Sequence, residues 1–291
     1  MTISRREIML AIAGSSLAHA AFADWALAAG PALATEWTSE HATRVRLVGG
    51  GHATGSTGRN RLLVGVEITM DKDWKTYWRN PGSSGVPPRL EWDGSQNLAG
   101  AEVLYPAPHR FPDREGDTIG YKGAVVLPVL VTPKDASKPV GLKLALEYGV
   151  CKDVCVPVQP SFNLELPADA ATRSTPKTLA AALAAVPRPM EKRHPRDPAV
   201  RKVSVVLAGR TPGITIAATF PPDGAGADAF LEAPDGLWVP LAKSVAGAKG
   251  AERTFFVDLT DGADIADLKG KTIRLTLVSA AGACETTFKM E

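Results

Sequence analysis

Apolar residues recur at every second position along most of the chain after residue 43, which indicates strands with one buried face. In one such run Leu62, Val64 and Val66 alternate with other residues up to Ile68. Similar patterns occupy residues 142–148, 162–166, 203–207, 214–220, 238–241, 255–259, 273–277 and 284–288. Residues 124–132 are a near-continuous apolar run that predicts a central strand, with Pro128 displaced to an edge or a bulge because it cannot donate to a ladder.

The alternation stops in the middle of the chain. Residues 174–186 favour a helix, with Ser174 or Thr175 as its cap and Pro176 in its first turn. The charged, proline-bearing stretch 189–198 is typical of a linker. The pattern therefore predicts an all-β protein of two immunoglobulin-like β-sandwich domains, 35–167 and 200–291, joined by a short helix and a Pro-rich linker within 168–199.

Residues 1–34 have the features of an export signal. Arg5 and Arg6 precede a short apolar stretch, and Ala-x-Ala triplets end at Ala20, Ala23, Ala28 and Ala34, each a candidate cleavage site. The paired arginines fit the twin-arginine route and also occur in ordinary signals. We expect a mature protein outside the cytoplasm, where disulfides can form.

Composition narrows the possible functions. The chain has 291 residues, with 33 basic and 31 acidic side chains and a net charge of +2. This balance gives no electrostatic footprint for a phosphate backbone, so nucleic-acid binding is excluded as a leading hypothesis. No second Cys or His pair stands at zinc-ligand spacing, and we expect neither a metal nor a cofactor.

Two of the three cysteines, Cys151 and Cys155, follow a strongly alternating strand. Residues four apart in a straight strand lie about 13 Å apart, so a disulfide between them requires a turn at residues 152–154. A ring this small contributes only about 2 kcal/mol of loop entropy and belongs to the kind that exchanges easily. A redox role and an inert hairpin disulfide both remain open. Cys284 shares strand parity with Phe288, which predicts a buried, unpaired thiol.

An aromatic run, Trp74 to Trp78, stands beside a turn-rich stretch that ends at Pro88. The rings either close one end of a sandwich or contact a partner, in which case Trp74, Tyr77, Trp78 and Arg79 are the candidates.

This run resembles a known family when it is taken together with four others. These are residues 102–108 (EVLYPAP), 119–123 (IGYKG), 126–129 (VLPV) and 148–157 (YGVCKDVCVP). In this order they resemble the N-terminal periplasmic domain of the DsbD/ScsB thiol:disulfide interchange proteins. The resemblance covers residues 37–166.

The resemblance implies a redox-active pair, Cys151 and Cys155. The pair would take electrons from a membrane-embedded DsbD/ScsB-type partner and reduce thioredoxin-like periplasmic proteins, as a thiol:disulfide oxidoreductase does. Asp117, Ile119 and Tyr121 align with the family's cap loop, and Tyr121 is the candidate for the aromatic that shields the bridge. The cysteines are closer in sequence than in the best-known members. The sequence also lacks the membrane and thioredoxin-like domains of the relay, so we expect a separate electron donor.

Two alternatives stay open. One is a non-catalytic binding or chaperone-like protein with a static disulfide. The other is copper handling, since thiols favour Cu(I), although the methionines are scattered. The sequence does not decide which cysteine attacks a partner.

Overall fold

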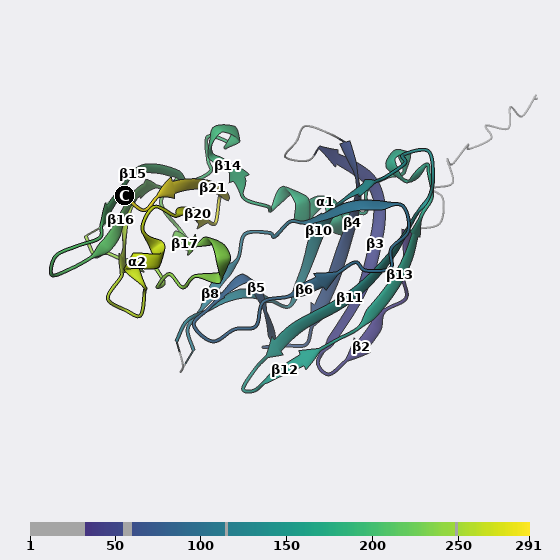
Figure 1. The fold of residues 1–291 in the computed structure, drawn as a ribbon, viewed down its shortest axis with the longest axis horizontal. Helices are drawn as coiled ribbons and strands as arrows, with labels where there is room; N and C mark the ends of the chain where they lie inside the picture. Colours follow the sequence, from purple (N-terminus) through teal and green to yellow (C-terminus); the bar gives the residue numbers. More distant parts are fainter. Residues whose placement is uncertain (1–32, 55–59, 114–115, 248–249) are drawn as a thin grey trace, which may run out of the picture.

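The computed structural model describes residues 33–54, 60–113, 116–247 and 250–291, and it confirms the all-β expectation. The strands form two sandwiches that lie side by side, with the C-terminus in the second (Figure 1). The predicted export segment lies outside the described residues except for Leu33 and Ala34, which form β1. No helix in the described residues is long and apolar enough to cross a membrane.

The first sandwich is built from residues 33–166. One sheet has the order β1-β3-β4-β10-β7, with β2 also paired to β3, and the facing sheet has the order β12-β11-β5-β9-β8, with β13 and β6 also paired to β11. The strands of the first sheet are β1 (Leu33–Ala34), β2 (Thr38–Glu40), β3 (Thr43–Thr54), β4 (Asn60–Met70), β7 (Leu98–Val103) and β10 (Ala124–Pro133). Those of the second are β5 (Lys75–Gly82), β6 (Arg89–Glu91), β8 (His109–Phe111), β9 (Thr118–Lys122), β11 (Val140–Cys151), β12 (Cys155–Val158) and β13 (Ser161–Leu166).

The predicted central strand is β10, which lies between β4 and β7. Pro128 occupies neither an edge nor a bulge, contrary to the expectation, and it faces Gly65 of β4. Its carbonyl accepts a hydrogen bond from the N–H of Leu104 at 2.7 Å, on the side of β7. The pairing of β10 with β7 starts only at Val129. Pro128 therefore lies just beyond the paired residues, and its missing N–H removes no hydrogen bond from the ladder.

The segment between the sandwiches contains a short helix, as predicted. It comprises η1 (Ala170–Thr172), α1 (Lys177–Ala184), β14 (Arg188–Pro189) and η2 (Met190–Lys192). The expected Ser or Thr cap is absent from α1, because Pro176 is the N-cap and no side chain bonds the first turn. Leu179 fixes the helix to the first sandwich, where it is fully buried with Val48, Leu63 and Leu130.

The second sandwich pairs a sheet of order β14-β21-β20-β17 with one of order β15-β16-β19-β18. Its other elements are β15 (Ala199–Val206), β16 (Gly213–Thr219), β17 (Asp228–Glu232), η3 (Pro234–Gly236), β18 (Lys243–Ser244), β19 (Glu252–Asp258), α2 (Ile265–Leu268), β20 (Thr272–Ser279) and β21 (Gly282–Lys289). The strand predicted at 238–241 is irregular instead. Pro240 offers no N–H for a ladder there.

The two sandwiches share a continuous apolar contact. Phe230, Val278 and Ala283 of the second sandwich belong to the buried core of the first. The Phe230 ring lies 5.7 Å from that of Trp78, centroid to centroid. Around this contact Arg79 binds Glu232 and Glu285, and Arg110 binds Asp228. Apolar burial with paired charges at its rim holds the sandwiches together as one unit.

Candidate functional site

The two nearby cysteines face each other across the hairpin of β11 and β12. Cys151 is the last residue of β11, Cys155 is the first of β12, and they form a register pair with Cα atoms 4.2 Å apart. A disulfide joins them. The turn at residues 152–154 that the spacing required is therefore present. It places Cys155 directly opposite Cys151, although the two residues are four positions apart in sequence.

The two sulfur-bearing residues differ in accessibility. Cys151 is only 6% exposed, whereas Cys155 is exposed. Val154, between them at the tip of the hairpin, is 70% exposed. An incoming sulfur can therefore reach the Cys155 side of the bridge, while the Cys151 side is covered by protein.

Strand β5 brings an aromatic hydroxyl to the bridge. Cys151 pairs with Lys75, which places Tyr77 two residues farther along the neighbouring strand. The Tyr77 hydroxyl lies 2.9 Å from Sγ of Cys155, although the ring is only 2% exposed. Burial, with a further contribution from Asp113, raises the pKa of Tyr77. The phenol therefore stays protonated at neutral pH and can donate to a thiolate.

A glycine on β9 permits this placement. Gly120 is the register partner of Tyr77, and a Cβ at Gly120 would overlap the carbonyl oxygen of Thr76. The close approach of β9 to β5 at this point therefore requires glycine.

The bridge lies in an open pocket of about 630 Å³. Asp113, Lys152 and Asp153 are the charged residues in its lining, and two of them form ion pairs with residues outside it. Lys75 is 6% exposed, and its Nζ donates to Asp113 at 2.7 Å and to Thr118 Oγ1 at 2.9 Å. Lys152 lies 3.8 Å from Asp73. The pocket is lined by Tyr77, Ser84, Asp113, Cys151, Lys152, Asp153, Val154 and Cys155.

The structure brings only some of the predicted site residues to this pocket. Ile119 and Tyr121 lie in β9 and are buried in the first core, and the Tyr121 hydroxyl donates to the carbonyl of Pro106 at 2.8 Å. Asp117 binds Arg110 at 3.2 Å. The cap role of these three residues stays a prediction, and Tyr77 is the aromatic residue that contacts the bridge.

The residues of the aromatic run lie in different places, some in the core and one at the disulfide pocket. Tyr77 lines the disulfide pocket and Trp74 packs partly buried against the first core. Trp78 is fully buried against Phe230, and Arg79 is held by Glu232 and Glu285. Trp78 and Arg79 thus join the two sandwiches, and their predicted partner role stays a prediction.

No sequence pattern pointed to the Lys75–Asp113 pair, which joins residues 38 positions apart. No pattern pointed to the ion pair between Arg110 of the first sandwich and Asp228 of the second, which lie 118 positions apart. Both depend on which strands become neighbours, and no local pattern encodes that.

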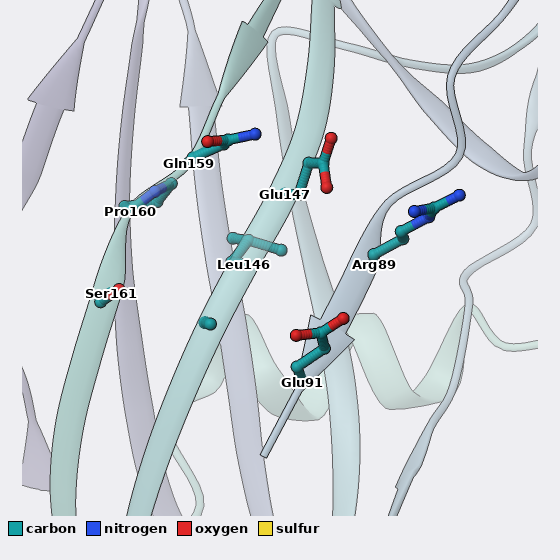
Figure 2. Close-up of a pocket in the computed structure, with 8 residues that line it drawn as sticks. Arg89, Glu91, Leu146, Glu147, Gln159, Pro160 and Ser161 are labelled. Atoms are coloured by element: carbon teal, nitrogen blue, oxygen red, sulfur yellow. The ribbon is translucent and has the colours of Figure 1, made fainter. Parts of the chain in front are cut away.

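Two other features of the described residues concern metal ligands and a second hollow. No group of three or more His, Cys, Asp or Glu that could hold a metal ion occurs among the described residues. A smaller hollow of about 300 Å³ lies where the chain passes from β12 to β13. Figure 2 shows Arg89, Glu91 and Glu147 around it, with Gln159 and Ser161 opposite, and its lining contains no cysteine or histidine. Of these two hollows, only the disulfide pocket is lined by cysteines.

Comparison with known proteins agrees with this site. Residues 52–167 match the family model described as "Thiol:disulfide interchange protein DsbD, N-terminal". This confirms the resemblance over that segment, which contains both cysteines of the bridge and Tyr77. No protein with a curated description matches the chain.

A solved structure extends the likeness to the second sandwich. The N-terminal periplasmic domain of ScsB from Proteus mirabilis matches with a TM-score of 0.65 at 22% identity. The match covers 89% of this chain and 100% of that one. The arrangement of two sandwiches is therefore shared with that domain.

Proposed function

We propose that this protein is a periplasmic thiol–disulfide exchange module, exported by its N-terminal segment, that works through Cys151 and Cys155. The observation that carries the proposal is the asymmetric bridge, with Cys155 exposed in an open pocket and Cys151 buried behind it. The match of this segment to the DsbD N-terminal family supports it.

In the reduced protein the exposed thiolate of Cys155 attacks a disulfide of the partner. A new S–S bond forms between Cys155 and the attacked sulfur, and the partner's other sulfur leaves as a thiolate that takes up a proton. The thiolate of Cys151 then attacks Sγ of Cys155. This restores the intramolecular bridge and releases the partner with two electrons and both thiols.

The oxidised module must then be reduced again by a dithiol donor. The segment that holds both cysteines matches the DsbD N-terminal family, and this likeness supports assigning the role to a membrane-embedded DsbD/ScsB-type protein. We assign the acceptor role to thioredoxin-like periplasmic proteins. The same exchange, run in the opposite direction through Cys155, transfers two electrons from the donor to the bridge.

The reduction potential of the couple tests the proposal. Purified protein carrying Cys284→Ala, equilibrated with defined thiol buffers and assayed for free thiols, is expected to give a value between about −180 and −270 mV, the range of exchange proteins. A bridge that resists reduction below about −300 mV would contradict the proposal and favour the alternative, a binding or chaperone-like protein with a static disulfide.

Single cysteine variants test the order of attack. Cys151→Ser is expected to accumulate a stable mixed disulfide with a thioredoxin-like protein, because the resolving thiol is missing. Cys155→Ser is expected to form little or none, since its remaining thiol is buried. Equal trapping by both variants would contradict the assignment of Cys155.

A further inference from the structure

The cysteine-bearing strand β12 lies at the end of its sheet. The order is β12-β11-β5-β9-β8, and within the described residues β12 pairs with β11 alone. The hairpin of β11 and β12 projects from the lower end of the first sandwich (Figure 1). An edge strand of this kind presents backbone N–H and C=O groups that another extended chain can pair with.

The register shows which backbone groups point outward. Cα atoms of Cys151 and Cys155 are 4.2 Å apart, the spacing of a non-hydrogen-bonded antiparallel pair. In such a pair the N–H and C=O of each residue point away from its partner strand. Those of Cys151 therefore point toward Lys75 of β5, with which it pairs. Those of Cys155 point out of the sheet.

Pro157 is the next residue of β12 with outward-pointing groups, since it is two positions farther along and pairs with Gly149. It has a carbonyl but no N–H. The open edge of β12 therefore offers one complete donor and acceptor pair, at Cys155, and one additional acceptor at Pro157. Because Pro157 cannot donate, a hydrogen-bonded ladder along β12 is short and has Cys155 as its main pairing residue.

The same geometry suits the chemistry of exchange. A residue that pairs with Cys155 through both outward groups lies with its Cα about 5.5 Å away. Disulfides span Cα separations of about 4.4–6.8 Å, and side chains of paired residues point to the same face of a sheet. A cysteine at that position can therefore bond to Sγ of Cys155 while its backbone is paired. Val154, 70% exposed beside Cys155, adds apolar surface at this end of the strand.

We propose that the exchange partner docks as an extended segment antiparallel to β12, with its reactive cysteine opposite Cys155. This inference rests on the exchange function proposed above and adds the form of the substrate, a cysteine in extended backbone. The electron transfer is the one already described. The partner disulfide is broken, the Cys155 mixed disulfide forms, and Cys151 resolves it.

Peptide disulfides of defined backbone test the docking. The reduced full-length protein is mixed with an extended peptide whose single cysteine is joined to 2-nitro-5-thiobenzoate, and the release of the coloured thiolate is followed. A second peptide carries an N-methyl group on the cysteine amide, which removes the donor to the Cys155 carbonyl. A third carries it on the adjacent residue, whose amide points away from β12. We expect the first and third peptides to react roughly tenfold faster than the second, the loss that about one backbone hydrogen bond gives.

Cystamine, which has no peptide backbone, separates the two proposals. If cystamine oxidises the reduced protein but all three peptides react at the same rate, exchange is real and the docking is wrong. If the purified protein exchanges with neither cystamine nor the peptides, the proposed function itself fails.

Two further measurements examine the edge directly. In Cys151→Ser protein trapped with the first peptide, the amide of Cys155 is expected to exchange its hydrogen at least tenfold more slowly than in the same protein trapped with cysteamine. Pro157→Ala supplies an outward N–H, and it is expected to raise the ratio of the peptide rate to the cystamine rate. An unprotected Cys155 amide or an unchanged ratio would overturn the docking.

Discussion

The hydroxyl of Tyr77 lies 2.9 Å from Sγ of Cys155, a residue 78 positions later in the chain. The contact follows from the pairing of Cys151 with Lys75, which sets β5 beside the hairpin that holds the disulfide. Because burial and Asp113 raise the pKa of Tyr77, the phenol keeps its proton. Its hydrogen bond therefore favours the thiolate form of Cys155 once the bridge is reduced.

Tyr77→Phe removes this donor, and we expect exchange at pH 7 to slow about tenfold, the lower end of the effect of one lost hydrogen bond to a charged group. The pH at which the rate is half-maximal is expected to move upward, because the thiolate is less stabilised. Stopped-flow rates with cystamine across pH measure both quantities.

Tyr121→Phe is the matched control for this variant. It also removes one phenol, but that phenol donates to the carbonyl of Pro106 inside the core. We expect its pH–rate profile to coincide with that of the wild type even if the protein is less stable. A shift in this variant and none in Tyr77→Phe would favour the predicted shielding role of Tyr121.

The sequence predicted a buried, unpaired thiol at Cys284, and the structure confirms both properties. Burial, with a smaller contribution from Asp197, raises the pKa of Cys284 from 9.0 to about 12. Iodoacetamide at pH 8 is therefore expected to leave Cys284 unmodified in the native protein and to modify it in urea. Modification of the native protein, detected by peptide mass spectrometry, would contradict this burial.

The same thiol gives the stability a pH dependence at alkaline pH. The unfolded chain loses the Cys284 proton near pH 9, whereas the native state keeps it up to about 12. The stabilisation is therefore complete below pH 9 and declines as the pH rises from 9 toward 12. Urea titrations of the wild type and of Cys284→Ala over this range should converge as the pH increases.

Arg79 clamps the second sandwich onto the first. Its guanidinium binds Glu232 and Glu285, and although burial lowers the pKa of Arg79, these two partners outweigh burial and raise it. Arg79→Met leaves Glu232 without its cation at a largely buried contact, while Glu285 keeps its ion pair with Arg274. We expect it to lower the free energy of unfolding by about 2 kcal/mol.

The matched control for Arg79→Met is Lys138→Met, which breaks an exposed ion pair with Asp135. It is expected to change the free energy of unfolding by less than about 0.5 kcal/mol. Urea unfolding followed by tryptophan fluorescence measures both variants. Equal midpoints for the two would show that the clamp contributes nothing to stability.

Asp197 holds the segment between the sandwiches together. Its carboxylate is 2% exposed, accepts two hydrogen bonds from Arg188 Nη1 at 3.1 and 3.0 Å, and accepts one from the N–H of His194. Asp197→Ala leaves these donors without a charged acceptor, and we expect a loss of about 3 kcal/mol in urea unfolding. Limited proteolysis should then cut first between residues 188 and 198. A wild-type cleavage pattern would contradict the role of this contact.

The sequence predicted the elements whose physics is local. Alternation at residues 62–68 and 142–148 predicted β4 and β11 because a half-buried strand must place every second side chain inward. The apolar 124–132 run predicted β10 in the middle of its sheet. The spacing of Cys151 and Cys155 required the turn that the hairpin provides, since no straight strand can join them. The parity of Cys284 with its strand predicted its burial.

Local patterns misled where a tertiary contact replaced the expected one. Residues 238–241 were predicted as a strand, but they are irregular, and Pro240 has no N–H with which to complete a ladder. Pro128 was expected at an edge, yet it lies in a central strand because β7 ends beside it.

The amino-acid sequence alone is enough to predict that this protein is built from strands and that its closely spaced cysteine pair lies in a DsbD-like segment. The groups that surround the pair depend on the packing of the whole sandwich. Tyr77 reaches the pocket because β5 and β11 are neighbours in one sheet, and Asp113, which also lines the pocket, binds Lys75 of β5. The tertiary structure also decided that Cys155 is exposed and Cys151 is not, and that Trp78 faces Phe230. Strand order depends on apolar burial summed over the whole sandwich, so no short stretch of sequence encodes it.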